Sequence, residues 1–252
     1  MSGAMNAAEQ VTAKATGPES LSAESRATAA RLAESYRVSP LDMVPNPSPL
    51  LVESTEEVAV PTSNGLFGLR AWRFADGAEH LSARALDRDG NPVPYEGGGV
   101  PAVRIHSECA TGDIFGSFRC DCGPQLENGL RIIGRTGGYL IYVRNHEGRG
   151  IGLVNKLRAY ALQDAGLDTL DANLALGLDG DMRDYSQAAL ILQELGVHEM
   201  RLVTNNPAKQ EALEGLGLRV TELIPDEIPA RVENAHYLHT KRERMRHLLE
   251  RA

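Results

Sequence analysis

The sequence predicts an α/β (α+β) fold, with a mixed sheet core, flanking helices and a β-rich N-terminal part. Three observations lead to this. From Val58 onward, short runs with turn signals at Asn64-Gly65 and Asp89-Gly90 indicate antiparallel strands. Beyond about residue 100, helical and strand patterns alternate. The chain has 252 residues, 42% of them hydrophobic, so it can bury a core as one large domain or two small ones.

Residues 1 to about 50 are predicted to form a weakly ordered extension, because they are rich in Ala, Ser and Glu and end in a run punctuated by proline at 45–49. Within it, Ala29, Leu32 and Tyr36 recur at helical spacing, so an amphipathic helix is plausible over 22–37. A solvated tail with transient helix is at least as good an interpretation. We therefore predict an extension over 1–55 and a folded domain over 56–252.

The remaining elements are predicted from periodicity and from glycine or proline breaks, and no internal repeat is found. In chain order they are a strand over 100–106, a helix over 125–135, a strand over 139–144, helices over 153–165 and 185–195, a strand over 199–204, a helix from Pro207 and a strand over 218–224. Gly166 and Gly196 directly follow two of the helices, where a left-handed cap would lie.

The formal net charge of −8 argues against a nucleic-acid polymer as partner, because proteins that bind phosphate backbones present a basic face. A small anion needs only a local basic pocket, for which 104–209 offers several candidates. No apolar run approaches membrane-spanning length, and the N-terminus lacks a basic start followed by an apolar stretch. We expect a soluble cytoplasmic protein.

All three cysteines, Cys109, Cys120 and Cys122, fall in one short stretch, which is not a disulfide framework. Three soft ligands without a fourth suit a tetrahedral zinc with one open position, where the cation would lower the pKa of a water towards neutrality. Buried cysteines that only pack are the ordinary alternative. A closed structural site completed by a histidine such as His106 is the other.

Five segments together resemble the GTP cyclohydrolase II family, in the order that the family has them. They are Arg104-Ile-His-Ser-Glu-Cys109, Arg119-Cys-Asp-Cys-Gly123, Glu147-Gly-Arg-Gly-Ile-Gly152, Asn155-Lys-Leu-Arg-Ala-Tyr160 and Thr204-Asn-Asn-Pro207. The resemblance covers roughly 58–250, and such a set is far more specific than one motif. It implies one zinc per chain on Cys109, Cys120 and Cys122 and a catalytic domain over 56–252.

The resemblance also implies the residues of the site. Contacts to GTP would come from Arg104, His106, Ser107, Glu108, Gln125, Glu147, Gly148, Arg149, Thr169, Thr204 and Lys209. The chemistry would fall to Tyr160, Asp181 and Arg183. We expect Mg²⁺ to accompany the triphosphate and the chain to form a homodimer.

Several of these positions make physical sense without the resemblance. Asn206 is a natural N-cap and Pro207 a first helical residue, so free amides there could face a phosphate, with Lys209 as a point charge. Lys156 and Tyr160 share one helix face. Taken in isolation, an Asn-Pro pair more often only caps a helix, and a tyrosine such as Tyr160 is more often a half-buried aromatic on a helix.

Glu147 and Arg183 carry the sharper expectations. A carboxylate can accept from both N1–H and the 2-amino group of guanine, so Glu147 suits the base edge. In the family that the sequence resembles, the arginine at the position of Arg183 is drawn as the nucleophile that releases pyrophosphate. A guanidinium stays protonated, so a clamp on phosphate charge is the easier role for Arg183, with Asp181 steering a water.

The sequence departs from the family pattern in two places. Between Tyr142 and Glu147 it is one residue longer, so Asn145 or His146 is an insertion beside the base-binding loop. The N-terminal extension is longer than in the shortest members but too short for the dihydroxybutanone phosphate synthase domain sometimes fused there.

The expected reaction opens the guanine ring of GTP at C8, with Tyr160 assisting, and releases formate and pyrophosphate. The product would be 2,5-diamino-6-(5-phosphoribosylamino)pyrimidin-4(3H)-one, a riboflavin precursor. Two alternatives stay open: a paralogue in secondary metabolism or pyrimidine breakdown, and a zinc-stabilised nucleotide-binding module without catalysis.

Overall fold

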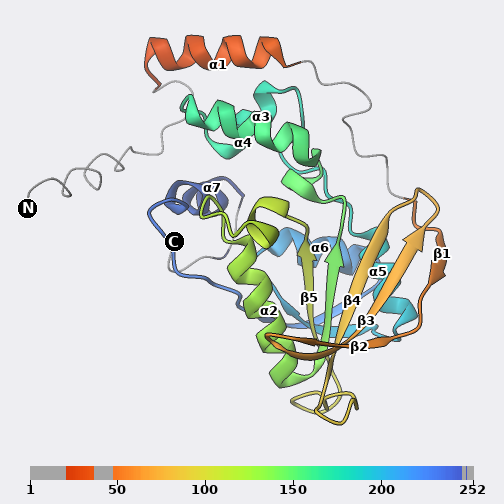
Figure 1. Ribbon diagram of the computed structural model, residues 1–252. Helices are drawn as coiled ribbons and strands as arrows, with labels where there is room; N and C mark the ends of the chain where they lie inside the picture. Colours follow the sequence, from red (N-terminus) through yellow and green to blue (C-terminus); the bar gives the residue numbers. More distant parts are fainter. Residues whose placement is uncertain (1–20, 37–47, 246–247, 249–252) are drawn as a thin grey trace, which may run out of the picture.

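The computed structural model describes residues 21–36, 48–245 and 248. These residues form one mixed sheet of eight strands, ordered β1-β3-β4-β6-β5-β7-β8, with β2 paired to β3 (Figure 1). The strands are β1 Leu51–Ser54, β2 Val58–Thr62, β3 Gly65–Phe74, β4 Glu79–Leu86, β5 Ala102–Ser107, β6 Gly138–Val143, β7 Glu199–Val203 and β8 Arg219–Ile224. The mixed α/β fold predicted from the sequence is confirmed.

The N-terminal half of the sheet is antiparallel. β2 and β3 form a hairpin in which Thr62 faces Gly65, so the turn lies at the predicted Asn64-Gly65. Gly65 has φ +128°, a conformation that glycine adopts without steric cost. β3 continues into β4, and β4 joins β6 antiparallel, which connects the two halves of the sheet.

The C-terminal half of the sheet is parallel, and β5 lies in its middle between β6 and β7. The chain leaves β5 through α2 (Cys122–Thr136) to reach β6, and it reaches β7 through α5 (Ser186–Glu194). These two helices cover opposite faces of the sheet. The carboxyl end of β5 is therefore a topological switch point, where open α/β sheets place their ligand sites.

Two hydrophobic clusters cover the two faces of the sheet. Side chains of β6 alternate between them: Tyr139, Ile141 and Val143 pack with α5, whereas Leu140 packs with Ile133 of α2. α6 (Pro207–Gly215) adds Leu213, fully buried, to the α5 side. This alternation is what a strand buried on both faces requires.

A third cluster lies away from the sheet, among α1 (Ala23–Ser35), α3 (Gly152–Asp164) and α4 (Thr169–Ala175). Ser22 caps α1 by accepting from the backbone N–H of Ser25, and Ala29 is buried in the cluster. Within the predicted 22–37, a helix over 23–35 is thus formed and packed on α3 (Figure 1). The rest of the predicted extension before β1, at 1–20 and 37–47, lies outside the described residues.

The other predicted elements are found within a few residues of the expected bounds. Gly166 and Gly196 have φ +109° and +75°, as a cap after a helix requires. α4 and the last helix, α7 (Ala235–Met245), were not predicted. β1, at Leu51–Ser54, lies inside the predicted extension of 1–55. Among the described residues, no helix is long and apolar enough to span a membrane.

Candidate active site and metal centre

One pocket opens at the switch point, where the segments after β5, β6 and β7 meet. Ser107 and Cys109 come from the end of β5, Glu147 follows β6, and Thr204 follows β7. α2 and α3 add Cys122 and Tyr160 to its wall. The pocket thus gathers the motifs that the resemblance singled out, although they are spread over a hundred residues.

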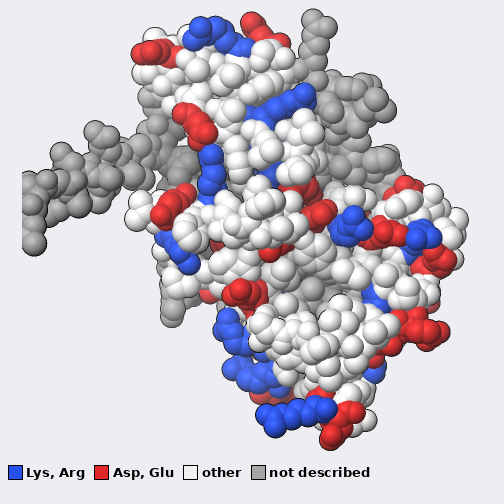
Figure 2. Space-filling view, in the orientation of Figure 1, with Lys and Arg blue, Asp and Glu red and all other residues white. Residues whose placement is uncertain are grey.

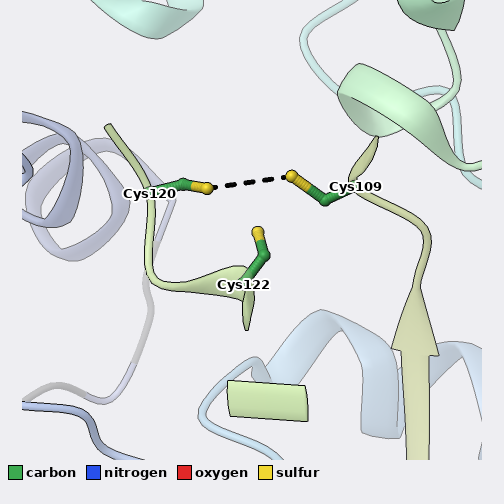
Figure 3. Close-up of side chains that lie close together, drawn as sticks. All are labelled: Cys109, Cys120 and Cys122. Atoms are coloured by element: carbon green, nitrogen blue, oxygen red, sulfur yellow. Dashed lines mark hydrogen bonds between the residues drawn. The ribbon is translucent and has the colours of Figure 1, made fainter. Parts of the chain in front are cut away.

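The three cysteines point their sulfurs at one another (Figure 3). Cys109 lies in the segment after β5, and Cys120 and Cys122 lie at the start of α2. The Cys109 and Cys120 sulfurs are 3.7 Å apart, and all three lie within 4.8 Å. A zinc with about 2.3 Å bonds in a tetrahedron needs sulfurs about 3.8 Å apart, so the described thiols fit this ion.

Two glycines make room for the sulfurs. A Cβ on Gly112 would lie 2.9 Å from the Cys120 sulfur and 3.2 Å from the Cys109 sulfur. A Cβ on Gly123 would meet the carbonyl oxygen of Gly112 at 2.5 Å. The backbone therefore approaches the thiols more closely than any side chain would allow, which simple burial of cysteine does not require.

The alternative of a fourth ligand from His106 is not supported. Its Nε2 lies 3.1 Å from both carboxylate oxygens of Asp113, and its ring stacks on Tyr142 at 5.5 Å. Among the described residues, the group of side chains close enough together to hold a metal ion consists of the three cysteines. A zinc ion held by these three thiols alone would keep its fourth position for water or substrate.

Two buried carboxylates hold the backbone that carries Cys109. Asp113 accepts from the N–H of Cys109 at 3.0 Å, and Glu147 accepts from the N–H of Ala110 at 2.6 Å. Lys156 donates to the Cys109 sulfur at 3.0 Å and to Glu147 Oε1 at 2.5 Å. Where thiols bind a metal, supporting contacts of this kind orient them, and their loss typically weakens metal binding about 10–100-fold.

The charges in this cluster favour a thiolate at Cys109. Its pKa is far below the ordinary value because the neighbouring thiols of Cys120 and Cys122, and then the Lys156 ammonium, stabilise the anion. Burial alone would lower the pKa of Lys156, but the Cys109 charge and the bond to Glu147 raise it. Thiolate is the form that binds metal.

The hydrogen bonds that Glu147 already accepts limit how many it can accept from a bound base. Oε1 already accepts from Lys156 and from the Gly148 N–H at 3.0 Å, and Oε2 accepts from Ala110. A carboxylate oxygen has two lone pairs, so one acceptor site is left, at Oε2. Two simultaneous bonds from a guanine edge, as expected from the sequence, do not fit this arrangement.

The pocket is basic although the chain is acidic. Among the described residues, six cationic side chains line it, against the two carboxylates Glu108 and Glu147; they are Arg104, Arg149, Lys156, Arg183, Lys209 and Lys241. On the face drawn in Figure 2, acidic and basic side chains are interspersed. The local positive charge is therefore a property of the pocket, and it suits a small polyanion.

Lys209 is buried close to other cationic side chains of the pocket. It is 5% exposed and donates to the carbonyl of Ile105 at 2.7 Å. Burial, and then the charges of Arg104 and Arg183, hold its pKa well below the ordinary value. A bound phosphate would relieve that repulsion. Lys209 lies near the start of α6, where Asn206 caps the helix by accepting from Ala208 N–H at 3.1 Å, as predicted.

Arg183 and Asp181 form a pair at the pocket wall. The Arg183 Nε donates to Asp181 Oδ1 at 2.9 Å, and its Nη2 binds the other oxygen. Burial alone would raise the pKa of Asp181, but Arg183 holds it below the ordinary value. Arg183 lines the pocket and Asp181 does not, so the pair aims the guanidinium at the pocket.

The loop before α3 is conformationally unusual. Arg149 has φ +69°, which is rare for a residue other than glycine, and lies between Gly148 and Gly150, also at positive φ. Its carbonyl accepts from the Met182 N–H at 2.9 Å. Backbone strain of this kind is typical of functional loops. The hydrogen bond from Met182 joins this loop to the segment that carries Arg183.

Tyr160 is placed to act as a donor. Its hydroxyl lies 3.4 Å from that of Thr111, and the Arg119 guanidinium lies 4.3 Å above its ring. Burial raises the pKa of Tyr160, so it keeps its proton near neutral pH. Lys156 Nζ is 5.7 Å from the ring, consistent with the shared helix face predicted for the two residues.

All but one of the predicted site residues line the pocket, the exception being Asp181. Sequence reasoning did not assign site roles to several other lining residues, namely His146, Lys156, Gln163, Asn173, Asn205, Asn206, Tyr237 and Lys241. Lys156 and Asn206 had a visible signal in helix spacing and capping. Tyr237 and Lys241 belong to α7, where no motif pointed to the pocket.

Comparisons with known proteins identify the family of this chain. The family model for GTP cyclohydrolase II matches residues 53–225. The chain is 52% identical over 198 residues to riboflavin biosynthesis protein RibBA of Rhodococcus jostii, covering 78% of this chain and 47% of that protein. It is 51% identical over 197 residues to proteins of the same name from Mycobacterium marinum and Mycobacterium tuberculosis, covering 78% of this chain and 46% of each.

The chain thus spans about half the length of the curated relatives it matches. A solved structure titled as RibBX, a two-domain 3,4-dihydroxy-2-butanone 4-phosphate synthase from A. baumannii, matches with a TM-score of 0.36 and 20% identity, covering 69% of this chain and 40% of that one. A likeness this weak adds nothing to the assignment. The family match and the relatives show that this chain belongs to the GTP cyclohydrolase II family.

Proposed function

We propose that this chain hydrolyses GTP at C8 of guanine, with release of formate and pyrophosphate. The product is 2,5-diamino-6-(5-phosphoribosylamino)pyrimidin-4(3H)-one. The observation that carries the proposal is a cluster of three thiols in the wall of a basic pocket. A nucleoside triphosphate can place its base towards the thiols and its phosphates among the lysines and arginines.

In this proposal, Cys109, Cys120 and Cys122 hold one zinc ion. Three thiolates leave a position open, and zinc bound there would supply a Lewis acid that lowers the pKa of water near the purine. The fit rests on the sulfur spacing and on the two glycines that let the backbone approach.

The residues around the thiols would handle the base. The protonated Tyr160 hydroxyl donates to the opening ring, and Oε2 of Glu147 accepts one hydrogen bond from the guanine edge. Arg104 is a weaker candidate for direct contact because it already binds the carbonyl of Val203 at 3.0 Å and Asp226 at 2.9 Å. Its Nη2 also donates to Gln125 Oε1 at 3.2 Å, which suits a role in positioning that pocket residue.

The phosphates would lie against Arg183, Arg149 and Lys209, near the start of α6. Arg183 stabilises the charge that develops as pyrophosphate leaves, because its guanidinium stays protonated and is held by Asp181. Thr169 and Thr204, which also line the pocket, would offer their hydroxyls to the same phosphates. Mg²⁺ would accompany the triphosphate and offset part of its negative charge.

The wider role follows from the relatives. Their name places them in riboflavin biosynthesis, and we propose the same pathway for this chain. A homodimer is the assembly proposed with it.

Two other functions would use the same pocket. A paralogue in secondary metabolism or pyrimidine breakdown would keep the thiols and change the product or the substrate. A binding module without catalysis would keep the thiols and basic groups but would not need Tyr160 aimed beside them, and the placement of Tyr160 therefore favours an enzyme.

The test is incubation of the purified protein with GTP, zinc and Mg²⁺, followed by mass analysis of the products. The proposal expects the diaminopyrimidine ribosyl phosphate. A formylated intermediate or a product that keeps all three phosphates would indicate the paralogue, and unchanged GTP that binds tightly would indicate the module.

A further inference from the structure

The segment after β6, over 144–146, forms a turn that directs His146 into the protein. Asn145 has φ +67°, a conformation that asparagine tolerates better than most residues, and its N–H donates to Glu108 Oε2 at 2.9 Å. His146 is then 7% exposed, and its ring lies edge-on to Tyr185 at 5.3 Å. The turn therefore buries the imidazole beside the pocket wall.

The two ring nitrogens of His146 have different partners. Nε2 lies 2.9 Å from the carbonyl oxygen of Asp184, and Nδ1 lies 3.1 Å from the Ser107 hydroxyl. A carbonyl oxygen can only accept, so Nε2 carries the hydrogen. Burial and the charge of Arg183 lower the pKa of His146 to about 3, so the ring is neutral near pH 7 and Nδ1 is an acceptor.

This fixes the polarity of the Ser107 hydroxyl. Because Nδ1 accepts, the Ser107 O–H donates to it, and the hydroxyl has no second hydrogen to offer. The serine oxygen keeps its lone pairs as acceptors. Ser107 is half-buried and lines the pocket. It therefore presents an acceptor, and never a donor, to whatever binds there.

A guanine edge needs two acceptors, one for N1–H and one for the exocyclic amino group. Glu147 has room for one, at Oε2. His146 precedes Glu147 directly, so the turn that fixes Ser107 also sets the position of Glu147. An acceptor whose polarity cannot reverse is what discrimination for a donor group requires, because a substrate that lacks the donor leaves it unpaired.

We propose that the Ser107 oxygen accepts a hydrogen bond from the exocyclic amino group of the guanine base, and that His146 is the positioning residue that fixes its polarity. This inference rests on the proposed function, which supplies a guanine nucleotide as substrate. Ser107 is then a specificity-determining residue, and His146 acts only through it.

The test compares kcat/KM for GTP and ITP, since ITP lacks the amino group, in the zinc-loaded protein. Ser107→Ala and His146→Phe should each reduce the preference for GTP over ITP by about tenfold, the value of one neutral hydrogen bond. They should lower turnover of GTP and leave that of ITP nearly unchanged. The double variant should lose no more preference than Ser107→Ala alone, because His146 acts through Ser107.

His80→Phe is the matched control. His80 is also buried and hydrogen-bonded through both nitrogens, to Gln187 and to the N–H of Arg144, but it does not line the pocket. The preference of His80→Phe for GTP over ITP should equal that of the wild type. Thermal unfolding of every variant checks that the protein compared is folded.

Three outcomes would overturn the inference: an unchanged GTP-to-ITP preference in Ser107→Ala, additive effects in the double variant, or a loss of preference for GTP over 2′-deoxy-GTP in place of that over ITP. The last would mean that a ribose hydroxyl is the donor. If the wild type turns over neither GTP nor ITP, the proposed function fails instead, and equilibrium binding of the two nucleotides still decides whether Ser107 distinguishes them.

Discussion

Replacing Lys156 by methionine tests whether the Lys156–Glu147 pair supports the cluster of thiols. Methionine keeps the length of the side chain but removes its charge and its donors. The change takes away the bonds to the Cys109 sulfur and to Glu147 Oε1. It leaves the Glu147 carboxylate buried, with its side chain 7% exposed, beside the thiols.

The magnitude follows from what Glu147 keeps. Removing one partner of a buried ion pair costs about 3–5 kcal/mol, because the other charge is left uncompensated. Glu147 retains the N–H groups of Ala110 and Gly148, so the lower end of the range applies. We expect a loss of about 3 kcal/mol in the free energy of unfolding, or roughly 6–12 °C in Tm for a chain of this size.

The assay is thermal and denaturant unfolding of the variant with excess zinc, with the zinc content measured alongside. Lys156→Met/Glu147→Gln should recover at least half of the lost stability, because it removes the uncompensated charge. Arg219→Met is the control, since it breaks the exposed pair with Glu199 and should change little. Wild-type stability in Lys156→Met, or no recovery in the double variant, would refute the reasoning.

Four further predictions concern the metal, the phosphates, the base and acid stability. Cys120→Ser should lose zinc and ring opening together, measured by metal analysis and product assay; full zinc in this variant would contradict the site. Arg183→Ala should greatly slow pyrophosphate release without unfolding the protein, and near-normal release would remove it from the mechanism. Glu147→Gln should erode the preference for GTP over ATP and ITP more than it weakens triphosphate binding, and an unchanged preference in competition assays would show that Glu147 does not touch the base. In the folded protein, burial lowers the pKa of His146 to about 3, so below the ordinary value of 6.5 the unfolded chain takes up a proton that the folded chain does not. The free energy of unfolding should therefore fall between pH 6.5 and 3, by up to about 1.4 kcal/mol per pH unit. Urea unfolding at each pH should show a shallower fall in His146→Asn.

Much of the pocket could be predicted because its residues lie in motifs at the ends of strands. Once β5, β6 and β7 are parallel neighbours, Ser107, Glu147 and Thr204 must meet at one edge of the sheet. The cysteines were also predictable, since all three lie in one short stretch. For α1, helical spacing gave the element, but only the packing of Ala29 on α3 and α4 could show that it is folded onto the protein.

What could not be predicted depends on contacts between distant segments. Lys241 binds Asp121 at 2.8 Å across 120 residues, and nothing in the charged stretch of α7 points to that partner. Helical spacing placed Lys156 beside Tyr160, but it could not show that a sulfur and a carboxylate lie opposite. The filled acceptor sites of Glu147 were hidden for the same reason, because two of its donors are backbone N–H groups.

The central claim is that the thiol cluster and the basic pocket act on one GTP molecule, and GTP labelled with ¹³C at C8 tests it most directly. The zinc-loaded protein should transfer the label to free formate, detected by NMR, while pyrophosphate appears in equal amount. Removal of zinc with a chelator should stop formate release. Label that stays in an intact purine while pyrophosphate is released would contradict the claim.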